Sequence, residues 1–265
     1  MVNAGISILS PKILKKLKGE TFYDFGKDVY PRIVHEGYKL FGYHTSEYIC
    51  DMGTIDRLSK VEKDVFNKKP DVLNLTKKQK AVFLDRDGTL IKFVHLISSL
   101  DDVALLPDVA KALNLWEKNN YLIIVVTNQP QVARGILTER EVEKMHHKVD
   151  TLLGAFNAKV DKYYFCPHHP DKGFKGERKA YKIDCDCRKP KAGLYLEASK
   201  KFNIDLKNSV YVGDSMSDIV VTKFVGGYSI LLESERIQTK NTVDFVPDFV
   251  CSNLYEAAKI STNLN

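Results

Sequence analysis

The stretch KAVFLDRDGT, residues 80–89, decides the fold of this chain. Its first five residues form a short, mostly apolar run, which predicts a strand buried on both faces. Asp85 and Asp87 follow the run directly, and Gly88 lets the chain bend tightly behind them. Two carboxylates this close repel each other, so the turn predicts a bound cation. The simpler alternative is a polar turn or a helix cap.

Apolar runs and amphipathic segments alternate after residue 80. Strands are expected at 80–85, 121–127, 162–166, 209–214 and 228–232, and helices at 107–120, 138–156 and 191–202. This alternation is typical of βαβ units and predicts an α/β fold with a doubly wound parallel sheet. Sites in such sheets lie beyond the carboxyl ends of the strands. The residues that end three of these strands, Asp85, Thr127 and Asp214, are therefore expected to meet.

The acidic residues at these strand ends suit phosphoryl transfer. Asp85 can attack phosphorus, and Asp87 can protonate the leaving oxygen and later activate water. Asp214 adds a carboxylate for Mg²⁺, which prefers oxygen ligands, and Asp218 can orient that carboxylate. A metaphosphate-like transition state needs mainly positioning and positive charge.

Polar and cationic residues on two further motifs complete this set. Thr127 and Asn128 in VVTNQ can hold phosphoryl oxygens, and Lys189 in RKPKAG supplies the charge. Together with DRDGT and GDSMSD, these motifs resemble those of the haloacid-dehalogenase-like (HAD) phosphohydrolases, in the same order. The resemblance implies a HAD-like sheet with Asp85 as nucleophile and Asp87 as general acid and base. It also implies that Thr127 and Lys189 hold the phosphoryl group, and that Asp85, the Asp87 carbonyl and Asp214 bind Mg²⁺.

A cysteine-rich loop, CPHHPDKGFKGERKAYKIDCDCRKP at 166–190, holds three of the five cysteines. Three thiols and one imidazole favour Zn²⁺, and four protein ligands leave no open position, so the metal is expected to be structural. The expected zinc ligands are Cys166, His168, Cys185 and Cys187. His169 is the rival to His168, and a redox pair or free thiols are the alternatives to a metal.

The motifs of this loop make the resemblance to a family more specific. DRDGT, TNQ…ARG, CPHHP and CDCRKP together resemble the D-glycero-D-manno-heptose 1,7-bisphosphate 7-phosphatases and the related histidinol-phosphate phosphatases, over about residues 80–255. The resemblance implies a phosphorylated-sugar substrate whose second anionic group is bound by Arg188. Arg134 is a second candidate for that role, the alternative being a surface arginine that opens a helix. Asn128 and Gln129 are further substrate-binding candidates.

The chain departs from the family pattern around the sugar. Pro130 and Gln131 replace a serine and a glycine, Ile91 replaces an asparagine, and Ser215 replaces a lysine. These changes leave the residues for phosphoryl chemistry intact but put the sugar contacts, and so the exact substrate, in doubt. We favour the heptose 7-phosphatase. The alternatives are a histidinol-phosphate phosphatase and, outside the enzymes, a catalytically silent sugar-phosphate-binding scaffold.

Composition limits the other possibilities. The chain has 265 residues, 44% hydrophobic and 28% charged, and a net charge of +6. It has no long basic block and no apolar run of membrane-spanning length, so neither a nucleic acid nor a membrane is an expected partner. No signal peptide is recognisable, so we expect a cytoplasmic protein.

Residues 1–65 need a separate explanation. NAGI and DMGT resemble the C-terminal part of sugar-1-phosphate nucleotidyltransferases, where Asp51 would bind metal. The glycine-rich nucleotide loop of that family is absent, so we expect a partial α/β remnant, the alternative being an independent binding module. Its incomplete surface predicts either association with a partner or weak order before residue 65. A linker is expected at 66–79 and the phosphatase domain at 80–265. A fusion of these two activities favours heptose over histidinol phosphate, because both would serve the synthesis of a nucleotide-activated heptose.

Overall fold

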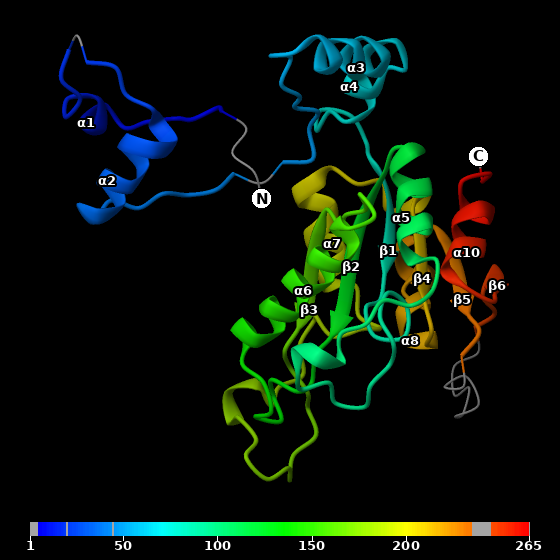
Figure 1. Ribbon diagram of the computed structural model, residues 1–265. Helices are drawn as coiled ribbons and strands as arrows, with labels where there is room; N and C mark the ends of the chain where they lie inside the picture. The colour runs from blue at the N-terminus through cyan, green and yellow to red at the C-terminus, as the bar shows by residue number, and fades with distance from the viewer. Residues whose placement is uncertain (1–4, 20, 44, 235–244, 265) are drawn as a thin grey trace. The chain divides into compact units, whose positions relative to one another are not determined.

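The computed structural model describes residues 5–19, 21–43, 45–234 and 245–264. Contacts within the chain define two units, residues 1–68 and 69–265. Figure 1 labels their strands and most of their helices. In the described ranges, no helix has both the length and the apolar character needed to cross a bilayer.

The first unit consists of helices, the first three of which share a small apolar cluster. Its elements are α1 (Pro11–Leu14), the π-helical turn η1 (Phe25–Val29), α2 (Tyr30–His35) and α3 (Ile55–Phe66). Ile13, Val29 and Ile33 form the cluster. The described part of this unit contains no strand, which differs from the α/β segment expected at 1–65. So small a cluster cannot cover the face of a sheet.

The second unit is built on a six-stranded parallel sheet in the order β3-β2-β1-β4-β5-β6. The strands are β1 (Lys80–Leu84), β2 (Tyr121–Asn128), β3 (Lys162–Cys166), β4 (Val210–Gly213), β5 (Tyr228–Leu232) and β6 (Phe249–Cys251). The first strand of the sequence therefore lies at the centre, between β2 and β4. This order confirms the parallel α/β sheet expected from the alternating pattern.

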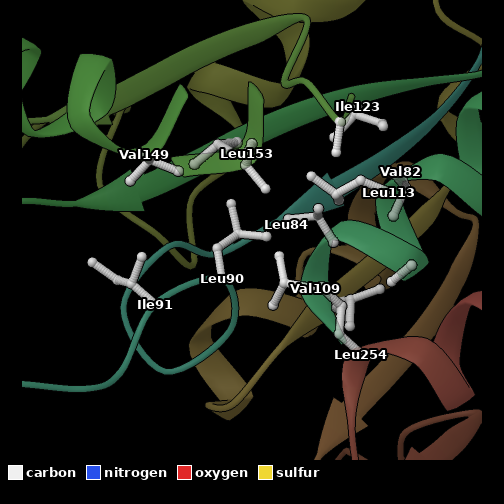
Figure 2. Close-up of a cluster of buried hydrophobic side chains, with 14 of the residues drawn as sticks. Val82, Leu84, Leu90, Ile91, Val109, Leu113, Ile123, Val149, Leu153 and Leu254 are labelled. Carbon is white, nitrogen blue, oxygen red and sulfur yellow. The ribbon is translucent and has the colours of Figure 1, made fainter. Parts of the chain in front are cut away.

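Helices cover both faces of the sheet. The longer ones are α5 (Val109–Lys118), α6 (Glu139–Gly154), α7 (Gly193–Phe202) and α10 (Leu254–Ser261). Side chains of α5, α6 and α10 pack with Val82, Leu84 and Ile123 on one face, as Figure 2 shows. On the other face, α7 packs with Phe83 and Ile124. A fully buried side chain of this kind contributes about 1.5–3 kcal/mol, so the two layers fix the register of the central strands.

The remaining elements are one to one-and-a-half turns long. They are α4 (Lys69–Val72), η2 (Leu100–Asp102), η3 (Lys179–Tyr181), η4 (Leu206–Asn208), α8 (Met216–Ile219) and α9 (Thr222–Val225). Part of the segment expected to be a linker at 66–79 is structured: it contains α4, and Leu73 and Leu75 pack against the core beside α7. Two apolar side chains in an otherwise lysine-rich stretch explain this difference, because burying them holds the segment on the domain.

Candidate active site

Parallel pairing of β2, β1 and β4 brings three polar strand ends to one edge of the sheet. Asp85 follows β1, Thr127 lies near the end of β2, and Asp214 follows β4; all three are buried. Gly88 has a φ of +91°, and a Cβ there would lie 2.2 Å from the Asp214 Oδ2. The DRDGT turn therefore requires glycine, both for its backbone conformation and for the approach of Asp214.

Lys189 is buried at the centre of these strand ends. Its Nζ lies 2.7 Å from Asp85 Oδ1 and 2.7 Å from Asp218 Oδ1, and it donates to the Val126 carbonyl at 2.7 Å. Burial alone would lower the pKa of Lys189, but the Asp218 and Asp85 carboxylates raise it above its ordinary value. The ammonium is therefore charged and directed at the nucleophile candidate.

Three buried carboxylates lie around this one ammonium. Oxygens of Asp85, Asp214 and Asp218 are all within 4.8 Å of one another. Complete burial raises the pKa of Asp218 to about 7, opposed by Lys189 and reinforced by Asp85. These three carboxylates are oxygen donors gathered at one place. Oxygen ligands suit Mg²⁺, so the donor set fits that metal.

Asp87 is held by hydrogen bonds from two neighbouring side chains. Arg86 Nη2 donates to Asp87 Oδ2 at 2.9 Å, and Gln129 Nε2 donates to the same oxygen at 2.8 Å. Gln129 Nε2 also donates to Thr127 Oγ1 at 2.9 Å, which leaves the threonine hydroxyl proton for a ligand. Gln129, expected to contact substrate, is fully buried; it positions Asp87 and Thr127 rather than lining the cavity.

Asn128 lies at the end of β2 and fixes the backbone of Lys189. Its Oδ1 accepts from the Lys189 N–H at 3.0 Å, and its Nδ2 donates to the Lys189 carbonyl at 3.2 Å. This reciprocal pair uses both ends of the amide. Asn128 lines the cavity, but its side chain is engaged in holding the lysine.

A cavity of about 280 Å³ opens over these groups. Its floor contains Asp85, Asp87, Thr127 and Lys189, and Arg134 and Arg188 form part of its wall. A second wall comes from the segment after DRDGT, with Phe93, Val94, His95 and Leu96. The cavity thus has reactive carboxylates at its base and two guanidinium groups at its side.

Both arginines are held by the cysteine-rich loop. Arg188 Nη1 donates to the His168 carbonyl at 3.2 Å. The Arg134 guanidinium lies over the Phe174 ring at 4.4 Å, a cation–π arrangement. Arg134 lies in a turn between β2 and α6 and is only partly exposed. The loop therefore positions the cationic wall of the cavity.

The loop converges on the four expected zinc ligands. Ligand atoms of Cys166, His168, Cys185 and Cys187 lie within 4.8 Å of one another, and the cysteines form no disulfide. Cys187 Sγ lies 3.1 Å from Cys166 Sγ and 3.2 Å from His168 Nδ1. The rival His169 lies outside this group and accepts from the Asp171 N–H at 3.2 Å. Three sulfurs and one ring nitrogen directed at one point fit a tetrahedral Zn²⁺ site.

One residue joins the cysteine cluster to the reaction site. Cys166 ends β3 and contributes its thiol to the cluster, while its carbonyl accepts from the Gln129 N–H at 2.8 Å. Cys166 also pairs in register with Asn128. The cluster is therefore fixed to the strand end that carries Gln129, the residue that positions Asp87.

The sequence reasoning missed three features of the site. The sequence gives no signal for the burial of Arg86, because a charged residue in a turn is usually exposed. The spacing of Asp218 from Asp214 in GDSMSD predicts that it orients Asp214, but not that it pairs with Lys189. No periodicity in residues 93–96 indicated that they would form a cavity wall.

A sequence model of the polynucleotide kinase 3 phosphatase family matches residues 80–252. The D-glycero-beta-D-manno-heptose-1,7-bisphosphate 7-phosphatase of Haemophilus ducreyi is 36% identical over 182 residues, which cover 64% of this chain and 97% of the relative.

Two solved structures share the fold. The D,D-heptose 1,7-bisphosphate phosphatase from B. bronchiseptica, complexed with magnesium and phosphate, superposes with a TM-score of 0.58 at 26% identity. It covers 69% of this chain and 97% of its own. A HAD-like phosphatase from Mesorhizobium loti gives a TM-score of 0.60 at 26% identity, over 70% of this chain and 86% of its own.

Proposed function

The chain belongs to the HAD superfamily, in the family of the D-glycero-beta-D-manno-heptose-1,7-bisphosphate 7-phosphatases, and we propose that it is a Mg²⁺-dependent phosphatase that removes the 7-phosphate of D-glycero-D-manno-heptose 1,7-bisphosphate. One observation carries the proposal: Asp85, Asp87, Thr127 and Lys189 meet at the base of a cavity whose wall holds two arginines. A substrate with one reacting and one non-reacting phosphate matches this distribution of charge.

In the first step, Asp85 attacks the phosphorus of the 7-phosphate. Lys189 occupies Asp85 Oδ1, so Oδ2 is the oxygen that forms the new bond. The bond between phosphorus and the sugar oxygen breaks, and that oxygen keeps the electron pair and takes a proton from Asp87. Lys189 and the Thr127 hydroxyl hold the phosphoryl oxygens during transfer, since positioning and positive charge are what this transition state needs.

In the second step, water hydrolyses the aspartyl-phosphate. Asp87, now a carboxylate, takes a proton from the water as its oxygen bonds to phosphorus. The bond to Asp85 breaks, which restores the Asp85 carboxylate and releases inorganic phosphate. Asp87 has then regained the proton it gave to the sugar, so the chain returns to its starting state.

Two metals belong to the proposal. Asp85, the Asp87 carbonyl and Asp214 would hold Mg²⁺, which would neutralise charge on the transferred phosphoryl group. The gathering of oxygens from Asp85, Asp214 and Asp218 within 4.8 Å of one another supports a divalent cation at this place. Cys166, His168, Cys185 and Cys187 would hold a structural Zn²⁺ that fixes the loop carrying Arg188.

Arg188 and Arg134 would bind the 1-phosphate, because a guanidinium forms paired hydrogen bonds with phosphate oxygens. The anchoring of Arg188 to the His168 carbonyl supports this role, since a positioned arginine loses less side-chain freedom on binding.

A phosphate-release assay with the two anomers of the heptose 1,7-bisphosphate and with histidinol phosphate tests the proposal. We expect hydrolysis of a heptose bisphosphate in the presence of Mg²⁺, and none by Asp85→Asn. Asp71→Asn, an exposed carboxylate on α4, is the matched control and keeps full activity. A large preference for histidinol phosphate would replace the substrate, and an inactive wild-type protein would favour the sugar-phosphate-binding scaffold.

The proposed binding of the 1-phosphate by Arg188 can be tested separately. Arg188→Met is expected to raise KM for the bisphosphate and leave KM for the heptose 7-phosphate nearly unchanged, because only the bisphosphate carries the second anion. An equal rise for both substrates would contradict binding of the 1-phosphate by Arg188.

A further inference from the structure

Arg86 lies between the two reactive aspartates, yet it points away from the cavity. Its side chain is completely buried, and it is absent from the residues that line the cavity. It therefore cannot reach a substrate in this conformation. A buried guanidinium costs several kcal/mol in lost hydration unless it is well paired, so its contacts indicate what it does.

The contacts are concentrated on Asp87. Arg86 Nε and Nη2 donate to Asp87 Oδ1 at 3.2 and 3.0 Å, and Nη2 donates to Oδ2 at 2.9 Å. Gln129 Nε2 adds a contact to Oδ2 at 2.8 Å. Each carboxylate oxygen thus accepts two contacts, and the plane of the carboxylate is fixed.

Gln129 locks this arrangement to the sheet. Its Oε1 accepts from Arg86 Nη2 at 2.8 Å, and its Nε2 donates to both Asp87 and Thr127. Exchanging the oxygen and nitrogen of the amide would break the contacts to Arg86 and Asp87, so its orientation is determined. The Gln129 backbone N–H is bound to the end of β3, so the support for Asp87 is anchored in the sheet.

The surroundings of Arg86 leave Asp87 as its only ion-pair partner among the described residues. The imidazole nearby, His146, is buried; this burial and the charge of Arg86 hold the pKa of His146 well below its ordinary value. His146 is consequently neutral and stacks on Tyr163 at 4.5 Å.

The geometry points to Arg86 as a positioning residue for Asp87, with Gln129 as its support; this inference rests on the proposed function. The guanidinium and the amide together fix the orientation of the Asp87 carboxyl group. They therefore hold it in the position from which it transfers a proton to the leaving sugar oxygen. The bond from phosphorus to Asp85 is affected only indirectly.

Leaving-group dependence separates this role from a structural one. A sugar alkoxide needs a proton to leave, whereas p-nitrophenolate does not. In Arg86→Met we expect kcat for the heptose bisphosphate to fall by about a hundredfold, the lower end of what proton transfer contributes, with little change in KM. The initial burst of p-nitrophenolate from p-nitrophenyl phosphate should keep nearly its wild-type rate. Arg86→Lys, which keeps the charge but lacks the fork, should recover part of the loss.

Arg140→Met, at an exposed position on α6, is the matched control and should leave both rates unchanged. If Arg86→Met does not fold, Gln129→Met removes the second contact to Asp87 and should show the same divergence of the two rates, to a smaller extent. Equal losses on both substrates in the folded variant would overturn the inference while leaving the proposed function intact. A wild-type protein that hydrolyses neither substrate would overturn both.

Discussion

Replacing Gly88 with alanine tests the close approach of the DRDGT turn to Asp214. A Cβ at this position would lie 2.2 Å from Asp214 Oδ2, whereas ordinary contacts begin at 3.4 Å. The carboxylate would therefore have to withdraw by about 1.2 Å, which is the difference between the two distances. Overpacking of this kind costs about 1–3 kcal/mol, and the positive φ of +91° adds about 1–3 kcal/mol of backbone strain.

Gly173→Ala is the matched control, because Gly173 has a φ of +98° but no atom within 4 Å of its Cβ position. Both variants carry similar backbone strain and the same change in unfolded-chain entropy. The difference between them in free energy of unfolding, measured with urea in the presence of a chelator, should thus be about 1–3 kcal/mol. This difference in free energy of unfolding measures the cost of displacing Asp214 alone.

The same displacement should weaken the proposed magnesium site. Metal–ligand distances tolerate about 0.2 Å, so a shift of about 1.2 Å, derived from the distances above, removes Asp214 as a good ligand. We expect the Mg²⁺ concentration for half-maximal phosphate release to rise at least about tenfold in Gly88→Ala, as metal-site changes typically produce, and to stay constant in Gly173→Ala. Equal unfolding free energies for the two variants, with an unaltered Mg²⁺ requirement, would refute this reasoning.

Three further perturbations have defined outcomes. With a chelator present, Lys189→Met should lower the free energy of unfolding by about 3–5 kcal/mol, because it leaves buried carboxylates unpaired. Adding Asp218→Asn should restore part of this loss. If the losses of the two substitutions, measured by urea unfolding, simply add, the pairing is contradicted. His146 has a folded pKa below its unfolded value near 6.5, so its contribution to stability is complete above that pH and is lost by about 1.4 kcal/mol per unit as pH falls below it. His146→Phe should flatten the decline between pH 7.5 and 5.5 in urea midpoints, and an unchanged slope would rule this out. Cys185→Ser should lower three quantities together: the zinc content measured by mass spectrometry, the melting temperature and the affinity for the bisphosphate. Phosphoryl transfer should continue. An unchanged KM in a zinc-free protein would show that the loop does not hold the arginines.

The central sheet could be predicted because its strands are continuous apolar runs. β1 to β5 lie within one or two residues of their expected ranges, since each run is long enough to be buried on both faces. β6 has three residues and α8 has four, which is too short for a period of two or 3.6 residues to appear. In 1–68, the described residues carry few buried apolar side chains, so the pattern there had little power to predict structure.

The parallel sheet predicts which residues meet at the site, but it does not predict which way their side chains point. Asp85, Thr127 and Asp214 meet because neighbouring parallel strands end at the same edge. Whether Gln129 faces the cavity or the core depends on the carbonyl of Cys166 and on the guanidinium of Arg86. These contacts join segments far apart in the sequence, and no local pattern encodes them.

The cysteine-rich loop is bracketed by two pairs of ligands, one at the end of β3 and one just before Lys189. The residues between these pairs, 169–184, do not line the cavity, but Phe174 among them lies against the guanidinium of Arg134. Exchanging this segment between relatives would therefore change the support of the cationic wall without replacing any side chain that meets the substrate. The affinity for the substrate could in this way be adjusted from outside the cavity, while the reactive base stays the same.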